Sequence, residues 1–269
     1  MQLQRLTIRA ALLGASILLV STGARAQLGA SEATNFEIGV ESSDSDTSDS
    51  TSSGTLGGRL KATIPLGTYF AASISGDYSE TKVRTRDVLA EAIGSLSGVR
   101  PSCDFDSTNG EVTLFARRPT LGKIGVSYGV GSLGSDCGAN SQFLITGNEK
   151  LSTEGYRVEA EYYFHDFTLA AARTSTELED GPKLESTSVT ASWYPHDSLR
   201  ISVSGNDLYD QDNYGIRFEH QPDFLGDAFG VHVGYARTDQ DPKTRTINLG
   251  LIYYFGTRVE LKVRDRQYR

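Results

Sequence analysis

Four histidines are the residues whose type first suggests catalysis, and one of them has a hydrolase-like spacing. His196-Asp197-Ser198 places an imidazole two residues from a hydroxyl, and a base that takes a proton from serine is the basis of nucleophilic catalysis. The motif follows Pro195 in a segment with the composition of a tight turn. A turn gives no fixed strand face on which to align a nucleophile and a base, so we interpret the motif as a polar turn.

The other histidines form no catalytic or metal-binding pattern. His165 falls in a second predicted turn, His220 near the end of a predicted strand, and His232 on the polar face of another strand. The sequence has no G-x-S-x-G, H-E-x-x-H or phosphate-binding loop. We therefore predict no catalytic residues, no metal site and no cofactor.

The N-terminus has the layout of a secretory signal peptide. Arg5 and Arg9 precede an uncharged, mostly apolar stretch at 10–20, and Ala24-Arg25-Ala26 supplies a small-x-small cleavage site. As a helix, that stretch would span only about half of a bilayer core, which argues against a membrane anchor. We predict that residues 1–26 are removed and that the protein is exported.

Cys103 and Cys137 are the two cysteines of the chain, and both lie in segments rich in Gly, Ser and Asp. An exported protein meets an oxidising compartment. Neither cysteine has a histidine close by in sequence, as a metal site would need. We predict a disulfide that ties two loops together.

The segments that must position the histidines and cysteines alternate between apolar and polar residues. This two-residue period is that of a β-strand. In 246–255, Ile247, Leu249 and Leu251 fall on one face, while Thr246 and Asn248 fall on the other. Similar alternation recurs along the chain. It predicts about twelve strands, near residues 36–43, 55–65, 68–79, 110–118, 122–132, 153–164, 167–177, 185–194, 199–207, 212–220, 228–237 and 246–255.

The connections between these strands alternate between short and long. The short ones are predicted at 65–67, 119–122, 165–166, 195–198 and 221–228. The longer, more polar ones are predicted at 44–54, 80–109, 133–152, 178–184, 208–211 and 238–245. Short turns at one rim and longer loops at the other are typical of an up-and-down transmembrane barrel. A Greek-key sandwich has no reason to alternate in this way.

Aromatic residues gather near both predicted rims. The short-turn rim has Tyr69, Phe70, Tyr163, Phe164, Phe167, Trp193, Tyr194, Phe229, Tyr253, Tyr254 and Phe255. The long-loop rim has Tyr78, Tyr128, Tyr156, Tyr214 and Tyr235. Two aromatic girdles around an aliphatic band are what two membrane interfaces select.

The composition is compatible with such a barrel. The chain is 38% hydrophobic with a formal net charge of -8. A helical membrane bundle would need several apolar runs of about twenty residues, and an acidic surface repels nucleic acid. A barrel needs an apolar residue only at every second strand position, so this content is sufficient.

Together, Ala24-Arg25-Ala26, the alternating pattern over 35–255 and the aromatic-ended strand 248–255 resemble Gram-negative outer-membrane β-barrels of the small porin-like kind. The resemblance implies an all-β, antiparallel transmembrane barrel in the bacterial outer membrane. Its partners would be outer-membrane lipid and lipopolysaccharide, the barrel-insertion machinery that reads such a last strand, and small hydrophilic solutes, with no nucleic acid.

We assign residues 27–255 to the barrel and residues 256–269 to a basic periplasmic tail. The tail departs from the usual pattern, in which the aromatic-ended strand is the last. Thr257–Val263 is an alternative thirteenth strand. We favour the tail, because single-chain bacterial barrels usually have an even number of strands.

If the apolar face meets lipid, the alternate face lines the lumen and carries charges of both signs. These predicted pore-lining residues are Glu37, Glu41, Arg59, Lys61, Asp77, Arg117, Lys123, Arg157, Glu159, Glu161, Arg200, Arg217, Glu219 and His232. Such charges cost several kcal/mol in hydrocarbon, at roughly 2–4 each, but little in water. The segment 86–96 has helical composition and would constrict the pore, cover it as a lid or decorate the surface.

Two main functions fit this interior. The first is a porin-like channel for passive diffusion of small hydrophilic solutes. The alternative is a barrel plugged by pairing of its internal charges, whose outer loops bind a partner. An outer-membrane enzyme ranks third.

Overall fold

The computed structural model describes residues 33–48, 51–85, 102–137, 150–179, 181, 183–207, 212–239 and 243–269. The predicted signal peptide and the segment 86–96 lie outside these residues. The strands are β1 (Asn35–Thr47), β2 (Thr51–Pro65), β3 (Phe70–Thr85), β4 (Ser102–Arg118), β5 (Gly122–Cys137), β6 (Lys150–Phe164), β7 (Phe167–Leu178), β8 (Lys183–His196), β9 (Leu199–Asn206), β10 (Asn213–His220), β11 (Phe229–Thr238) and β12 (Thr244–Phe255). A 3-10 turn, η2 (Asp223–Leu225), and a helix, α3 (Leu261–Tyr268), complete the described elements.

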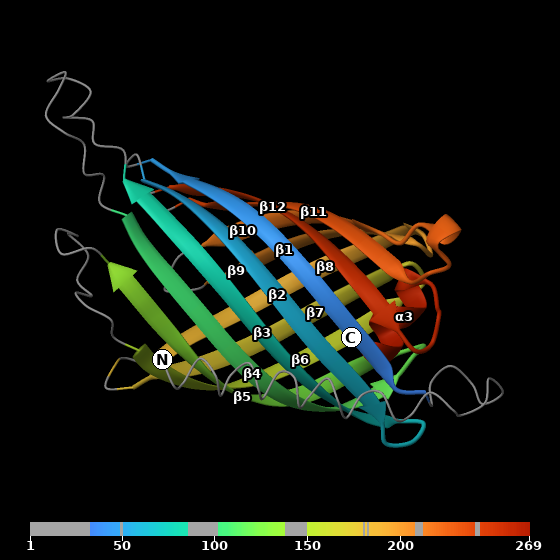
Figure 1. The fold of residues 1–269 in the computed structure, drawn as a ribbon. Coiled ribbons are helices and arrows are strands. Elements are labelled where there is room, and N and C mark those ends of the chain that lie inside the picture. Colours follow the sequence, from blue (N-terminus) through green and yellow to red (C-terminus); the bar gives the residue numbers. More distant parts are fainter. Residues whose placement is uncertain are drawn as a thin grey trace, which may run out of the picture.

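The strands form one closed antiparallel barrel (Figure 1). Each strand pairs with its neighbours in sequence, and β1 pairs with β12 to close the ring, from Phe36 opposite Phe255 to Thr47 opposite Thr244. The prediction of an all-β, up-and-down barrel of twelve strands is confirmed. Within the described part of the chain, none of the helices has the length and apolar character needed to cross a membrane.

The outer wall of the barrel is an apolar belt. Leu114, Val126 and Val158 are register partners on β4, β5 and β6, and each leaves about half of its surface uncovered by protein. The same holds for aliphatic side chains all around the ring. Soluble proteins rarely expose so continuous an apolar surface, whereas hydrocarbon matches it.

The inner wall is polar. Thr113 and Ser127 share a hydrogen bond of 2.8 Å across β4 and β5, and Ser192 and Ser202 share one of 2.8 Å across β8 and β9. All four hydroxyls are buried inside the ring. Hydroxyl pairs of this kind satisfy polar groups within the wall and leave room in the lumen.

The strands run further toward the long-loop end than the hydropathy pattern predicts. The predicted link 80–109 shrinks to 86–101, because β3 continues to Thr85 and β4 begins at Ser102. The predicted link 44–54 is a tight connection, since Asp44 pairs with both Gly54 and Ile247. Beyond the membrane both faces of a strand meet water, so backbone pairing continues without an apolar face.

Both cysteines lie on strands and not in loops. Cys103 is the second residue of β4, Cys137 is the last residue of β5, and their Cα atoms are register partners. This placement is compatible with a bridge across two adjacent strands. The disulfide between the two residues stays a prediction.

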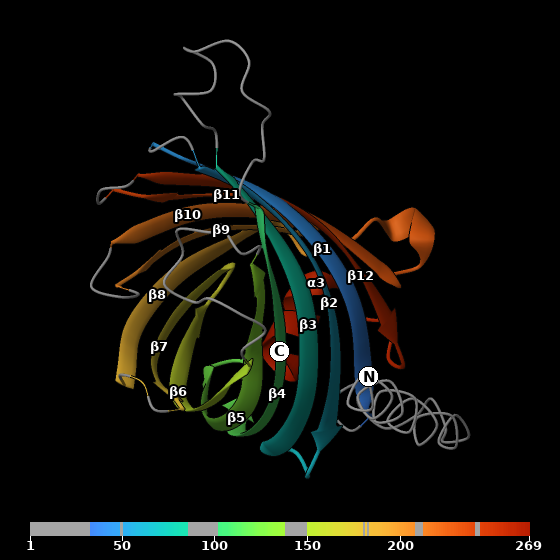
Figure 2. The same ribbon diagram turned by 60° about the vertical axis from the view of Figure 1, so that its left-hand side comes forward.

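The chain turns back into the barrel after β12, which differs from the predicted periplasmic tail and from the alternative of a thirteenth strand. Gly256 has a φ of +98°, and a Cβ at that position would lie 2.6 Å from the carbonyl oxygen of Thr34. Only glycine adopts this turn without strain. Leu261–Tyr268 then forms α3, which lies within the ring of strands near the short turns (Figures 1 and 2).

Candidate functional site

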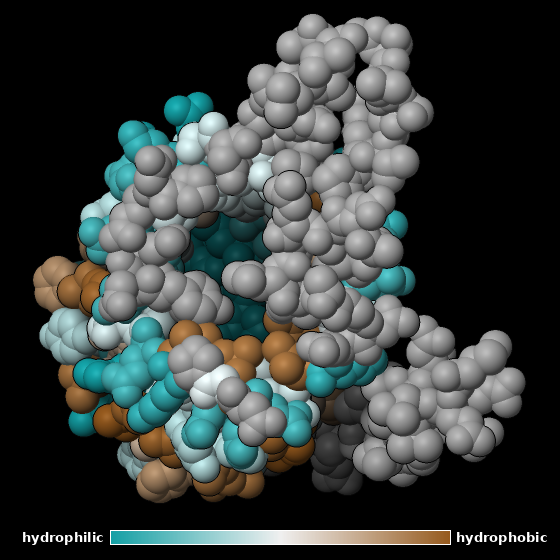
Figure 3. Space-filling model, turned by 90° about the vertical axis from the view of Figure 1, so that its left-hand side faces the viewer, coloured by the Kyte–Doolittle hydropathy of each residue, from teal (hydrophilic) through white to brown (hydrophobic). Residues whose placement is uncertain are grey.

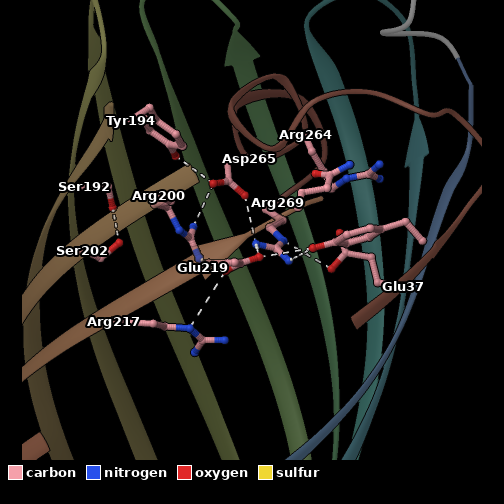
Figure 4. Close-up of polar contacts among 12 residues, drawn as sticks. Glu37, Ser192, Tyr194, Arg200, Ser202, Arg217, Glu219, Arg264, Asp265 and Arg269 are labelled. Atoms are coloured by element: carbon pink, nitrogen blue, oxygen red, sulfur yellow. Dashed lines mark hydrogen bonds and ion pairs between the residues drawn. The ribbon is translucent and has the colours of Figure 1, made fainter. Parts of the chain in front are cut away.

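The inner end of the lumen, where the short turns are, is organised around Glu219. Its side chain is 1% exposed and forms an ion pair with Arg200, its register partner on β9. Its other carboxylate oxygen accepts hydrogen bonds from Arg269 at 2.8 Å and from the Tyr254 hydroxyl at 3.2 Å (Figure 4). Arg217 lies 4.0 Å away. A buried carboxylate is stable only with such partners.

Asp265 on α3 is a second carboxylate at this end. It accepts hydrogen bonds from the Tyr194 hydroxyl at 2.8 Å and from Arg200 at 2.9 Å. It also pairs with Arg269 at 3.0 Å, one helical turn away. Arg200 therefore joins the wall carboxylate Glu219 to the helix carboxylate Asp265. We give the name α3 network to the residues Glu37, Tyr194, Arg200, Arg217, Glu219, Tyr254, Arg264, Asp265 and Arg269.

Arg269 is held at both of its ends. Its guanidinium reaches Glu37 on β1 at 3.4 Å and the Tyr254 hydroxyl at 2.6 Å, in addition to Glu219. Its carbonyl oxygen accepts hydrogen bonds from Lys123 at 2.7 Å and from Lys61 at 3.4 Å. Side chains from five strands thus surround this one residue.

Arg264 on α3 is fully buried, as are Leu261 and Tyr268. Its guanidinium donates to the side-chain oxygen of Asn35 at 2.9 Å and to the carbonyl oxygens of Asp227 and Val259 at 3.2 Å. It also stacks over the Tyr254 ring, 3.8 Å from the ring centroid. Arginine is suited to this environment because its planar group combines stacking with several donors.

Lys262 and Arg266 attach the helix to the turns at the rim. The ammonium of Lys262 reaches Asp166 at 2.7 Å and Asp197 at 3.1 Å. This hydrogen bond lowers the pKa of Asp166 and raises that of Lys262 from their ordinary values. Arg266 donates to the carbonyl oxygen of His165 at 2.7 Å and lies 5.0 Å from the centroid of the Tyr163 ring.

Three tyrosines that the sequence assigned to the short-turn rim point inward. Tyr163, Tyr194 and Tyr254 are each at most 4% exposed and contact α3. Strand alternation explains this, because each is next to an outward-facing aromatic residue. The outward aromatics keep their predicted place, as in the stacked pair of Phe167 and Trp193.

Two glycines give the inner side chains room to cross a strand. A Cβ on Gly230 would lie 2.8 Å from the Tyr254 hydroxyl, and one on Gly250 would lie 2.2 Å from the imidazole of His232. The bare backbone at Gly250 lets His232 on β11 reach over β12 to Glu41 on β1, at 3.0 Å.

The structure brings part of the predicted pore-lining set together around α3. Lys123 pairs with Glu159 and Glu161 at 3.0 Å, and Arg157 pairs with Glu159 at 3.3 Å. The members that contact α3 or its neighbours are Glu37, Lys61, Arg117, Lys123, Glu161, Arg200 and Glu219. A role of these residues in lining a conducting pore stays a prediction.

Arg59 and Asp77 are register partners further from the short turns and take no part in the α3 network. The sequence reasoning missed Arg264, Asp265 and Arg269 completely. The signals present were a glycine directly after the last strand and arginines at helical spacing behind it.

A cavity of about 170 Å³ remains beside α3. Its lining on β7 and β8 includes Thr168, Ala170, Thr190 and Ser192, and Arg266 and Arg269 border it from the helix side. At roughly 30 Å³ per water molecule, the cavity has room for a few waters.

The long-loop end of the lumen is different. Seen from that end, the molecule is hollowed, and the visible interior is hydrophilic (Figure 3).

The His196-Asp197-Ser198 motif forms a local turn. His196 Nδ1 lies 2.9 Å from the Ser198 hydroxyl and also accepts from the Ser198 backbone N–H at 3.4 Å. In a Ser-His-Asp triad, Nδ1 faces the carboxylate and Nε2 faces the serine. Ser198 is also 4% exposed. The described residues contain no cluster of three potential metal ligands from His, Cys, Asp and Glu.

Comparison with known proteins identifies a fold and no family. No family model matches the chain, and no curated protein matches it as a relative. Among solved structures, the chain is similar to the COG4313 outer membrane channel from Pseudomonas putida F1, with 10% identity, a TM-score of 0.58 and coverage of 86% of this chain and 100% of the other.

Two further structures share this architecture. The KdgM porin, in complex with disordered oligogalacturonate, has 7% identity and a TM-score of 0.51, covering 81% of this chain and 99% of the porin. The β domain of the Bordetella autotransporter BrkA has 9% identity and a TM-score of 0.54, covering 83% of this chain and 100% of that domain. The chain thus has the fold of bacterial outer-membrane barrels.

Proposed function

We propose that this barrel is a porin-like channel for passive diffusion of small hydrophilic solutes, and that α3 closes its inner mouth. The observation that carries the proposal is the hydrophilic hollow at the long-loop end (Figure 3). A barrel with only a structural role would not need a wide, wet interior. A porin and an outer membrane channel are among the proteins with a similar fold, which supports the same function.

The contacts of α3 favour a closure that moves. The helix offers few apolar groups, because its buried members are Leu261, Arg264, Asp265 and Tyr268. Ion pairs and hydrogen bonds therefore hold it, and water that enters the lumen can solvate the polar groups that are released when the helix withdraws. An apolar plug of the same size would resist displacement more strongly.

Conductance in planar bilayers tests the proposal. We would compare the full chain with a variant that ends at Glu260, after confirming by circular dichroism that both are folded barrels. We expect the full chain to give small, intermittent currents and the shortened chain to give larger, steady ones, by about tenfold. If the folded, shortened chain carries no current across a range of voltages and salt concentrations, the channel proposal is wrong.

The plugged barrel remains the second candidate, and one observation favours it. Arg200, Glu219 and Arg269 close the centre of the inner mouth with paired charges. If the variant without α3 still carries no current, the closed barrel would be the functional form. A binding partner should then be sought at the outer loops.

A further inference from the structure

We propose that the inner mouth holds a binding site for free arginine, and that Arg269 occupies it as a tethered ligand. The inference deepens the proposed function, on which it rests, by naming the class of solute that the lumen recognises. The strands themselves supply the site. Its polar groups are Glu37, Lys61, Lys123, Glu219 and Tyr254, from five different strands.

The guanidinium of Arg269 lies in a pocket of acceptors. Glu37 on β1 and Glu219 on β10 offer carboxylate oxygens at 3.4 and 2.8 Å, and the Tyr254 hydroxyl lies between them at 2.6 Å. Two carboxylates and a hydroxyl around one planar cation use the several N–H donors of a guanidinium, whereas an ammonium is a compact point charge with three donors.

Two lysines contact the opposite end of Arg269. Lys123, which also pairs with Glu159 and Glu161, donates to its carbonyl oxygen at 2.7 Å, and Lys61 donates at 3.4 Å. The side chain of Lys123 is 2% exposed. The carboxylate of free arginine would lie at the position of this oxygen and would form charge-assisted hydrogen bonds with both lysines.

The two ends together match one whole amino acid. A plug needs only bulk and some polar contacts, and Arg264 provides both. Its guanidinium contacts an amide oxygen, backbone carbonyl oxygens and the Tyr254 ring rather than a carboxylate. Arg269, in contrast, has carboxylates at its cationic end and lysines at its carbonyl end. The wall groups would keep this polarity when α3 withdraws.

A tethered ligand competes with a free one at an effective concentration in the millimolar range. The full chain is therefore expected to bind free arginine weakly, and removal of the tether is expected to reveal the site. Glu219 keeps its pair with Arg200 in either state, so its second oxygen stays available and oriented.

Isothermal titration calorimetry of the detergent-solubilised barrel tests this inference without using current. The variant ending at Glu260 would be titrated with L-arginine, with L-citrulline, which has the same shape without the charge, and with agmatine, which lacks the carboxylate. We expect arginine to bind at least tenfold more tightly than either analogue, and tenfold more tightly than it binds the full chain. Adding Glu219→Gln should abolish the difference, and adding Asp77→Asn should not.

Equal binding of arginine and citrulline by the shortened chain would overturn the inference, as would equal affinity of the full and shortened chains. If the shortened chain fails to fold, Arg269→Ala in the full chain empties the same pocket and serves instead. Conductance without arginine decides the channel proposal separately, so a barrel that conducts but does not bind arginine would refute this inference alone.

Discussion

The two ends of the lumen are built by the same twelve strands but differ in what fills them. At the short-turn end, Glu219 is 1% exposed within a network of arginines and tyrosines. Toward the long-loop end, the interior is open and hydrophilic (Figure 3). Inward charges occur at both ends. The difference shows that the wall alone does not decide whether a barrel of this size is open.

The deciding element is the short segment 256–269, which turns at Gly256 and places α3 inside the ring. It adds Arg264, Asp265 and Arg269 to one end only. There each charge gains a partner from the wall, and the wall charges lose their water. Substitutions at the inner end should therefore cost much more than equivalent ones near the long loops.

Replacing a carboxylate tests this contrast with the largest expected effect. Glu219→Gln removes one charge partner from Arg200 and one from Arg269, which keep their pairs with Asp265, and breaking a buried pair costs about 3–5 kcal/mol. We expect a loss of unfolding free energy of that size in urea titrations of the refolded barrel. The protein should also conduct more often, because α3 loses one of its attachments.

The control is Asp77→Asn, which replaces a carboxylate on the same inner wall that accepts one long hydrogen bond, from Asn109 at 3.5 Å. We expect a change within about 0.5 kcal/mol, as for most substitutions with little burial. Equal losses for the two variants would show that the ends of the lumen do not differ in the way described.

Adding one methyl group tests the same contrast with a smaller effect. A Cβ on Gly250 would lie 2.2 Å from His232, so Gly250→Ala forces the imidazole away from Glu41. Overpacking of this kind costs about 1–3 kcal/mol. On Gly129, toward the long loops, the nearest atom would be 3.4 Å away, which is an ordinary contact.

We expect Gly250→Ala to lower the urea midpoint clearly and Gly129→Ala to leave it nearly unchanged. A crystal structure of the first variant should show the His232 ring rotated. If both variants unfold at the midpoint of the unmodified protein, the inner end is more loosely packed than the structure indicates.

The sequence predicts the barrel because lipid demands an apolar residue at every second position. Leu114, Val126 and Val158 show this demand directly. The demand for alternate apolar residues stops where the strands leave the membrane. The segments Glu80–Thr85 and Ser102–Asn109 therefore pair as strands although their hydropathy does not alternate. The ends of β3 and β4 were missed for this reason.

Only the part of the candidate site that lies on the strands could be predicted from the sequence. Alternation places Glu37, Arg200 and Glu219 on the inner face, and the structure keeps them there. Their partners come from a helix far away in sequence, and no local pattern connects Arg269 to Glu37 or Tyr254. Polar contacts between distant segments depend on the closed fold, which the periodicity of single strands does not contain.

The smallest expected effect concerns the rim, where α3 meets solvent. The pKa of Asp166 lies below its ordinary value because Lys262 donates a hydrogen bond to it, and the pKa of Lys262 is raised by the same bond. A carboxylate with a lowered pKa stabilises the folded state above its ordinary value near 4 and loses this effect as the pH falls through the lowered value. The lysine contributes below its ordinary value near 10.5 and loses this effect at higher pH.

The protection factors of the α3 amides, which correct for the pH dependence of intrinsic exchange, should therefore be high at neutral pH and lower near pH 3 in the refolded barrel. Glu260 acts with the opposite sign, because burial and the nearby Asp197 raise its pKa. The measurement is best made in a Glu260→Gln background, with His165, Arg266 and Asp197 as the remaining charged neighbours. Lys262→Gln should flatten the acid dependence. If the protection factors of this variant still fall by the same factor, the rim contacts do not hold the helix, and the buried arginines do so alone.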